Sequence, residues 1–166
     1  MGAMAKSGVR TALVGIALCA AAAIALADDR SICGSVPPKS DAFAACSRII
    51  ATPATSDHDR ALAYSFRGDA VRAKGDMAGA IADYSQALTL LPNLIPALIG
   101  RGMAYLNSGD NAHAIADLDL AVQLVPQNAK ALYQRGVAKT KTGDTSGGDA
   151  DIAAATKLDP NVASWP

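Results

Sequence analysis

From residue 61 onwards, small and apolar residues return at the same places every 34 residues. The segments 61–94, 95–128 and 129–162 align without a gap and share eleven identical positions. In the first segment these positions are Ala63, Arg67, Gly68, Ala70, Gly75, Asp76, Ala82, Asp83, Ala87, Leu90 and Pro92. A gapless match of this length indicates three copies of one structural unit that stack on one another.

Each unit is predicted to contain two antiparallel helices joined by a tight turn. Gly75, Gly109 and Gly143 suit the left-handed residue that ends a helix, and the aspartate after each suits an N-cap. The proline near the end of each unit closes the second helix, because it cannot continue the helical hydrogen bonds. A glycine inside the first helix, such as Gly68, costs about 1 kcal/mol relative to alanine. Its recurrence in every unit implies that two helix backbones approach closely there.

Charged residues recur inside the units with the same period. They are Arg67, Arg101 and Arg135, and Asp83, Asp117 and Asp151. We expect a structural ladder of Arg–Asp pairs, within units or between neighbours, because a guanidinium can hold a carboxylate with two hydrogen bonds. The alternative is a row of arginines that binds an anionic ligand. The shared period of the aspartates favours pairing.

The first 27 residues have the pattern of a secretory signal peptide. Lys6 and Arg10 precede an uncharged run over 11–27, which closes on Ala25-Leu26-Ala27. Small residues at the outer places of that triplet suit signal peptidase, so we expect cleavage after residue 27. The mature protein is therefore expected to be periplasmic or secreted.

Two alternatives to a cleaved signal peptide carry less weight. An uncleaved membrane anchor would need a longer apolar run for a spanning helix. A lipoprotein anchored through Cys19 would need a small residue before the cysteine, where Leu18 stands.

Residues 28–60 are expected to form an N-terminal cap with half a repeat. The stretch 41–50 resembles the second helix of a unit, and the connection that follows carries about four extra residues. A polar, proline-broken stretch over 28–40 takes the place of the missing first helix. After signal cleavage only Cys33 and Cys46 remain, and in an oxidising compartment we expect them to form a disulfide that holds the cap. The alternative is two unpaired buried thiols.

Composition and motifs exclude several classes of function. Removing residues 1–27 takes away Lys6 and Arg10, which leaves thirteen basic and fifteen acidic residues. Every acidic residue is an aspartate. This balance gives no electrostatic case for nucleic acid, and no lysine-rich run marks a membrane surface. No phosphate loop, nucleophile elbow or zinc motif is present, so we expect no catalysis, no cofactor and no metal.

The spacing and residue types resemble the tetratricopeptide repeat family. The residues that carry the resemblance are Gly68, Ala80, Tyr84, Ala87 and Pro92 in the first unit, Gly102, Ala114, Leu118, Ala121 and Pro126 in the second, and Gly136, Ile152, Ala155 and Pro160 in the third. The third unit departs from the pattern, with Gly148 where an alanine opens the second helix. The resemblance implies an all-α, right-handed α-solenoid of antiparallel helix pairs, with three repeats and an N-terminal half-repeat.

The expected organisation follows from these observations. It comprises a signal peptide at 1–27, the cap with its half-repeat helix at 28–60, repeats at 61–94, 95–128 and 129–162, and a C-terminal tail at 163–166. Trp165, the only tryptophan, lies in that tail.

The resemblance also implies a concave face lined by the first helix of each unit. The residues expected to contact a partner there are Leu62, Phe66, Asp69, Ile99, Met103, Leu106, Lys130, Tyr133 and Val137. An apolar groove of this kind suits an extended or helical peptide. Alternatively, these side chains pack against their neighbours, or the C-terminal tail folds over them. Of the places where chaperone-binding members hold a terminal carboxylate, only Lys130 fits, so no such clamp is expected.

The sequence thus predicts a small exported bacterial scaffold that mediates protein–protein interaction in the cell envelope. A non-catalytic receptor for an envelope polymer or a small ligand is the alternative, and would use aromatic residues such as Phe66 and Tyr133. Self-association through the groove is a further alternative. After signal cleavage we expect no contact with the membrane.

Overall fold

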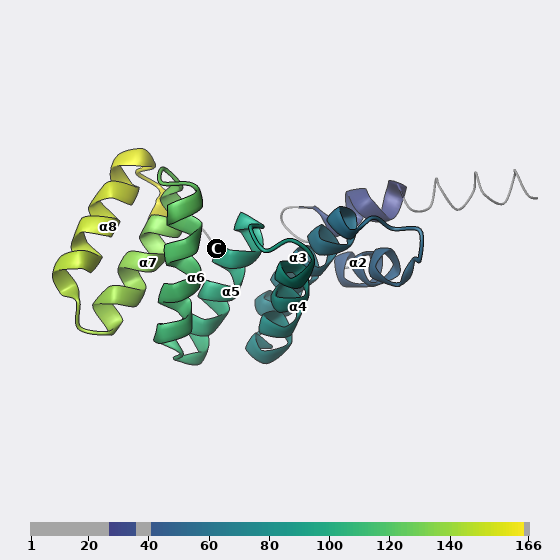
Figure 1. Cartoon of the computed structure of the whole chain (residues 1–166), viewed down its shortest axis with the longest axis horizontal. Helices are drawn as coiled ribbons and strands as arrows, with labels where there is room; N and C mark the ends of the chain where they lie inside the picture. The colour runs from purple at the N-terminus through teal and green to yellow at the C-terminus, as the bar shows by residue number, and fades with distance from the viewer. Residues whose placement is uncertain (1–26, 36–40, 165–166) are drawn as a thin grey trace, which may run out of the picture.

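The computed structural model describes residues 27–35 and 41–164, and within these ranges it contains helices and no strands. Residues 27–33 are helical, and they are followed by α2 (Ala42–Ala51), α3 (Asp57–Ala73), α4 (Met77–Leu90), α5 (Ile95–Ser108), α6 (Asn111–Leu124), α7 (Ala129–Lys141), α8 (Thr145–Leu158) and the 3-10 helix η1 (Val162–Ser164). The helices stand side by side along the long axis of an all-α solenoid (Figure 1). Among the described residues, no helix is both long and apolar enough to cross a membrane.

The turn between the two helices of each unit has the predicted chemistry. Gly75, Gly109 and Gly143 have φ values of 86°, 85° and 95°, which is the left-handed region that glycine tolerates best. The following aspartate caps the next helix in every unit. In the first unit the Asp76 carboxylate accepts a hydrogen bond from the Gly79 N–H at 2.9 Å.

The glycine inside the first helix of each unit lies against a side chain of the second helix. A Cβ atom at Gly68 would lie 2.8 Å from Cε1 of Tyr84. In the second unit the same contact is made by a leucine side chain. In the third unit a Cβ at Gly136 would lie 2.7 Å from the carbonyl oxygen of Gly148. In the first two units the glycine makes room for a large side chain of the second helix, and in the third it also makes room for the backbone of that helix.

The Arg–Asp pairs lie within units, between the first helix and the second. The two bonds of each pair measure 2.8 and 2.6 Å for Arg67–Asp83, 2.7 and 2.7 Å for Arg101–Asp117, and 2.7 and 2.6 Å for Arg135–Asp151. All three carboxylates are buried. The arginines are therefore satisfied in the folded chain and do not form a row that waits for an anion.

The same arginines also connect neighbouring units. The third nitrogen of each guanidinium bonds to the second helix of the preceding unit, at Ser47 for Arg67, Ser85 for Arg101 and Asp119 for Arg135. These distances are 3.2, 3.1 and 3.1 Å. Each arginine therefore fastens its own two helices together and holds the unit against the one before it.

The N-terminal cap contains a helix where the sequence predicts only an irregular stretch. Residues 27–33 are helical because both prolines of the predicted stretch come after them. Cys33 and Cys46 form a disulfide with a Cα–Cα distance of 4.9 Å, which ties this helix to α2. Arg48 on α2 also holds the buried carboxylate of Asp29 through a bidentate contact.

The first helix of the first repeat begins four residues before residue 61, where the repeat is predicted to start. Helix α3 starts at Asp57, and the side chain of Ser56 caps it by accepting a hydrogen bond from the Asp59 N–H at 3.1 Å. The extra residues of the connection therefore form an additional turn of helix. His58 lies in this turn.

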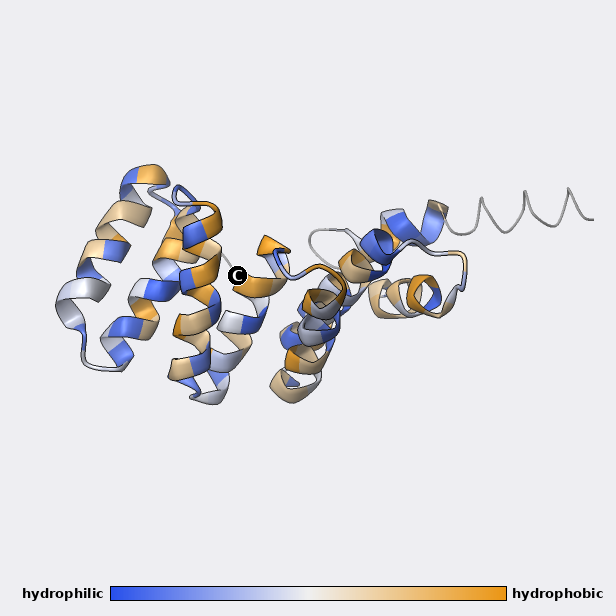
Figure 2. Ribbon diagram, in the orientation of Figure 1, coloured by the Kyte–Doolittle hydropathy of each residue, from blue (hydrophilic) through white to orange (hydrophobic). Residues whose placement is uncertain are grey.

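Burial is spread along the stack and not concentrated at one centre. The largest cluster joins α4 to α7, a smaller one lies beneath the cap around the disulfide, and a third joins α7, α8 and η1. Figure 2 shows the same distribution, with apolar residues on every helix. Such an arrangement is expected of a repeat array, in which each unit buries its surface against its neighbours.

The exposed side of α8 differs from the corresponding side of α6. On α6, Asp119 bonds to Arg135 of the next unit, and Val122 packs against the cluster that contains Leu132. At the same places α8 has Ala153 and Thr156, and both are exposed. Helix α8 thus lacks the acceptor and the apolar contact that dock a following unit.

Candidate functional site

Two hollows lie along the first helices of the units, and we name them by position. The central hollow has a volume of about 270 Å³ and is lined by Asp69, Ile95, Pro96, Ile99, Gly100, Met103, Asn128 and Lys130. The cap hollow has a volume of about 160 Å³ and is lined by Arg30, Cys33, Ile49, Asp59, Leu62, Ala63 and Phe66. Helix α3 contributes to both, so the two hollows belong to one face.

A tyrosine from the second helix of the first repeat shapes the central hollow. Tyr84 is fully buried and donates its hydroxyl hydrogen to Asp69 at 2.7 Å. Its ring reaches that position because α5 has Gly100 opposite it, where a Cβ would lie only 2.5 Å from the ring. Burial, and next the negative charge of Asp69, raise the pKa of Tyr84, so its hydroxyl stays protonated and keeps donating.

Two cations accompany this carboxylate. Arg72 places Nη2 3.9 Å from Asp69, and its Nε is buried without a hydrogen-bond partner within the described chain. Lys130 lies at the start of α7, half-buried on the lining of the hollow. Burial and the charge of Arg72 lower the pKa of Lys130, although Asp69 opposes this. The cluster thus brings two cationic side chains and one carboxylate together near the central hollow.

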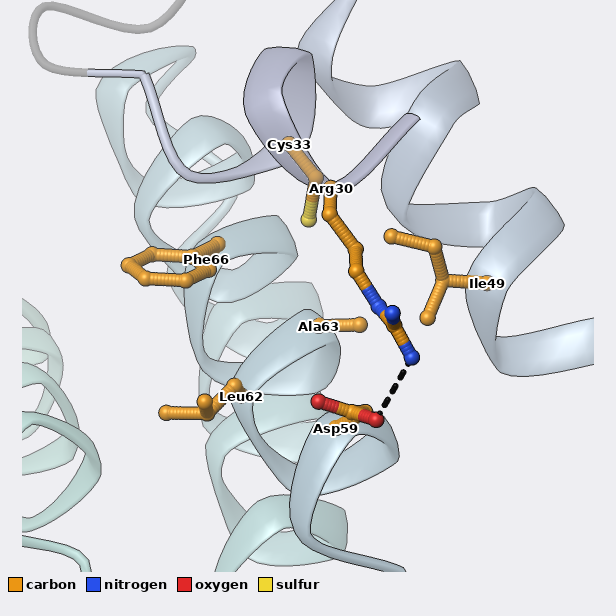
Figure 3. A pocket seen from close by; sticks show the side chains of 7 residues that line it. All are labelled: Arg30, Cys33, Ile49, Asp59, Leu62, Ala63 and Phe66. Carbon is orange, nitrogen blue, oxygen red and sulfur yellow. Dashed lines mark hydrogen bonds and ion pairs between the residues drawn. The ribbon is translucent and has the colours of Figure 1, made fainter. Parts of the chain in front are cut away.

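The cap hollow is apolar inside and has a charged rim. Figure 3 shows Phe66 and Leu62 on one side of it and Ile49 on the other, with Ala63 between them. Arg30 reaches from the cap helix to Asp59, and Nη2 lies 2.7 Å from Oδ2 (Figure 3). The two charges pair with each other, so the rim adds no net charge.

The residues predicted to contact a partner fall into several groups. Asp69, Ile99, Met103 and Lys130 line the central hollow, and Leu62 and Phe66 line the cap hollow. Ile99 and Met103 are only 6% and 8% exposed, so they form a floor and not an open surface.

The remaining three predicted residues lie outside the two hollows. Leu106 is 5% exposed and packs in the main core cluster, so its assignment to a partner surface is wrong. Tyr133 is half-buried and packs against the cluster that contains Val162. Val137 is half-buried on α7. Trp165, assigned to the tail, lies outside the described residues.

Several lining residues were not predicted. Asn128 and Ile95 stand at helix starts, where the turn between units meets the face, and both contribute to the central hollow. Arg30 and Ile49 come from the cap, whose position on the face depends on the disulfide. A helical pattern assigns residues to a face, but these residues reach the face from loops and from a neighbouring element. Among the described residues, no group of three or more His, Cys, Asp or Glu side chains could hold a metal ion.

Comparison with known families gives one match. The middle unit, residues 95–128, fits the model described as tetratricopeptide repeat. No curated protein matches the sequence.

Solved structures with the same fold include three with sequence identity above one quarter. The tetratricopeptide repeat domain of Sgt2 from Aspergillus fumigatus is 27% identical, with a TM-score of 0.59 over 66% of this chain and 69% of that chain. The first such domain of human RPAP3 is 26% identical, with a TM-score of 0.60 over 64% of this chain and 83% of that chain. The first such domain of Spaghetti (RPAP3), bound to the HSP90 peptide SRMEEVD, is also 26% identical, with a TM-score of 0.61 over 63% and 82% of the two chains.

Proposed function

We propose that this chain, whose middle unit fits the tetratricopeptide repeat model, is a protein-interaction scaffold and that it binds a peptide segment of another protein on the face that carries the two hollows. The central hollow is the observation that carries this proposal. It combines an aliphatic floor with a polar rim, which is the usual composition of a site for a peptide side chain. No catalytic step is part of the proposal.

The charges around the central hollow favour an acidic residue in the peptide. Lys130 and Arg72 place two cations near this hollow, and burial and repulsion from Arg72 lower the pKa of Lys130. An incoming carboxylate would relieve that repulsion. The RPAP3 domains bind peptides rich in glutamate and aspartate, SRMEEVD among them. In this chain the recognition would involve one anion, because Lys130 is the only residue that fits the two-carboxylate clamp.

We also propose that the protein works in an oxidising compartment of the cell envelope. Residues 1–27 have the charge and length pattern of an export signal. The disulfide between Cys33 and Cys46 supports the same location, since such bonds persist mainly outside the cytosol.

The floor of the central hollow favours a peptide over the alternative ligands. Ile95, Ile99 and Met103 are aliphatic, and the aromatic residues Phe66 and Tyr133 do not line this hollow. A receptor for a polymer or a small ring compound would require aromatic stacking surfaces at this place.

A selection from a random dodecapeptide library displayed on phage tests the proposal with the oxidised chain from residue 28. We expect the enriched peptides to carry an acidic residue and to lose about tenfold in affinity when Lys130→Glu reverses one cation, as measured by fluorescence anisotropy. Lys157→Glu makes the same change on an exposed residue of α8 and should leave binding unaltered. The proposal fails if no peptide is enriched, or if the enriched peptides bind the Lys130→Glu variant as tightly as the original chain.

A further inference from the structure

We propose that the cap hollow binds one aliphatic or aromatic side chain of the partner peptide, so that the disulfide-bonded N-terminal cap helps to set sequence specificity. This inference rests on the proposed function, because it concerns the same peptide and the same face. It assigns a binding role to residues of the cap, which lies outside the three repeats.

Size and lining determine what the cap hollow can hold. Ile49, Leu62, Ala63 and Phe66 provide hydrocarbon walls around a volume of about 160 Å³. A cavity of about 150 Å³ lined by such side chains accepts a benzene molecule. One leucine, methionine or phenylalanine side chain therefore matches the space, and an alanine would leave most of it empty.

The rim of the hollow selects against a charged side chain. Arg30 and Asp59 already pair with each other, and Asp59 also accepts a hydrogen bond from the Ser56 hydroxyl at 2.9 Å. A charged guest would have to leave water for an apolar interior in which both rim charges already have partners. The side chains of the pair are 50% and 32% exposed, and exposed ion pairs contribute little stability, so an apolar guest can displace Arg30 at small cost.

Helix α3 relates the two hollows in space. Leu62 and Phe66 line the cap hollow, and Asp69 lines the central hollow. Leu62 and Asp69 are seven residues apart, which corresponds to about 10 Å along an α-helix. An extended peptide covers that distance with about three residues. The partner should therefore place an apolar residue about three positions from the acidic residue expected at the central hollow.

The wall formed by the cap is specific to this end of the array. Cys33 and Arg30 come from the cap helix, and Ile49 comes from α2, which the disulfide ties to that helix. Gly34, just after the cap helix, lies against the ring of Phe66, where a Cβ would approach Cε2 to 3.2 Å. The cap and the first repeat thus form the hollow together.

Two substitutions at Leu62 test the inference with peptides from the same dodecapeptide selection. Leu62→Trp fills the mouth of the hollow, and we expect it to weaken an enriched peptide about tenfold. The same peptide with its apolar residue changed to alanine should bind the original chain about tenfold more weakly, and Leu62→Trp should then cause no further loss. Leu62→Ala enlarges the hollow and should shift the preference from leucine towards phenylalanine or tryptophan. Leu124→Trp, at an exposed leucine of α6, is the matched control and should bind like the original chain.

The outcomes separate this inference from the proposed function. If Leu62→Trp and Leu62→Ala bind the peptides unchanged while Lys130→Glu weakens them, the cap hollow is not a binding site, and the proposed function stands. If Lys130→Glu also has no effect, the proposed function itself fails. Circular dichroism shows whether Leu62→Trp folds. If that variant does not fold, peptide binding by Leu62→Ala decides whether the cap hollow is a binding site.

Discussion

Single arginines connect three helices of this molecule. Arg101 lies on α5, holds Asp117 of α6 with two bonds, and bonds to Ser85 of α4. The sequence predicted a pairing from the shared period, but the period alone does not distinguish a pair within a unit from a pair between units. The structure also adds the third bond, which no repeat alignment indicates because its acceptor changes from serine to aspartate along the array.

Replacing Arg101 by lysine should destabilise the fold while the charge is kept. An ammonium cannot reach both oxygens of Asp117 and also Ser85, so a buried carboxylate loses bonds, at a cost of about 1–3 kcal/mol in the free energy of unfolding. Ser85→Ala removes only the bond between units and should cost less. Denaturant unfolding monitored by circular dichroism measures both, and equal losses for the two variants would contradict this account.

Acid should weaken the last unit through Asp151. Burial opposes ionisation of this carboxyl group, but hydrogen bonds from Arg135 and Lys139 outweigh it, so its pKa is lowered from 3.8. A carboxyl group with a lowered pKa stabilises the fold above its unfolded-state pKa, and this contribution is lost as the pH falls through the folded-state value. The melting temperature should therefore decrease as the pH is lowered below about 4. It should fall less in Asp151→Asn, which has already lost the contribution, whereas Asp149→Asn, exposed on the same helix, should follow the original profile.

At the scale of elements, one covalent bond and two ion pairs hold the cap helix to the rest of the array. The disulfide and the Asp29–Arg48 contact tie the cap helix to α2, and the Arg30–Asp59 pair reaches α3. The sequence predicted the half-repeat and the bond. It did not predict the cap helix or the early start of α3, because Ser56 acts as an N-cap only once the connection is compact enough to begin a helix there.

Removing the disulfide should therefore loosen the cap before the repeats. The double substitution Cys33→Ala and Cys46→Ala should cost about 3 kcal/mol, as expected for a closed loop of this length. Hydrogen exchange should accelerate in residues 27–33 and in α2, while α7 and α8 keep their protection, because each unit depends mainly on its neighbours. Equal acceleration along the whole chain would show that the array unfolds as a single unit and would contradict the prediction.

At the scale of the molecule, local signals predicted the fold and long-range packing determined the site. The turn residues Gly75 and Asp76 specify their structure within four positions, so the sequence was sufficient for the units. The central hollow needs Asp69, Tyr84 and Gly100, which lie on three different helices. Leu106 was misassigned for the same reason, since its exposure depends on the neighbouring helices as well as on its place in the helical pattern.

The contacts between the second helix of one unit and the first helix of the next predict where the array can be lengthened. A second copy of 95–128 inserted after residue 128 would place a new Arg101 beside Asp119 and a new Leu98 beside Val122, in the manner of the third unit. We expect this insertion to raise the free energy of unfolding and the denaturant m-value. The same copy added after Ser164 would meet Ala153 and Thr156 and should add no stability. Equal gains from both positions would show that these contacts do not determine docking.

The bond between the cap helix and α2 has a mechanical consequence. Cys33 and Cys46 are 13 positions apart, and the residues between them cannot be drawn out while the bond is intact. A chain pulled from its two ends would therefore be shorter at full extension by roughly 40 Å in the oxidised form than in the reduced form. A tensile load applied through the N-terminus would pass directly from the cap to the middle of α2, so the loop of the cap would stay closed even after the helices around it had come apart.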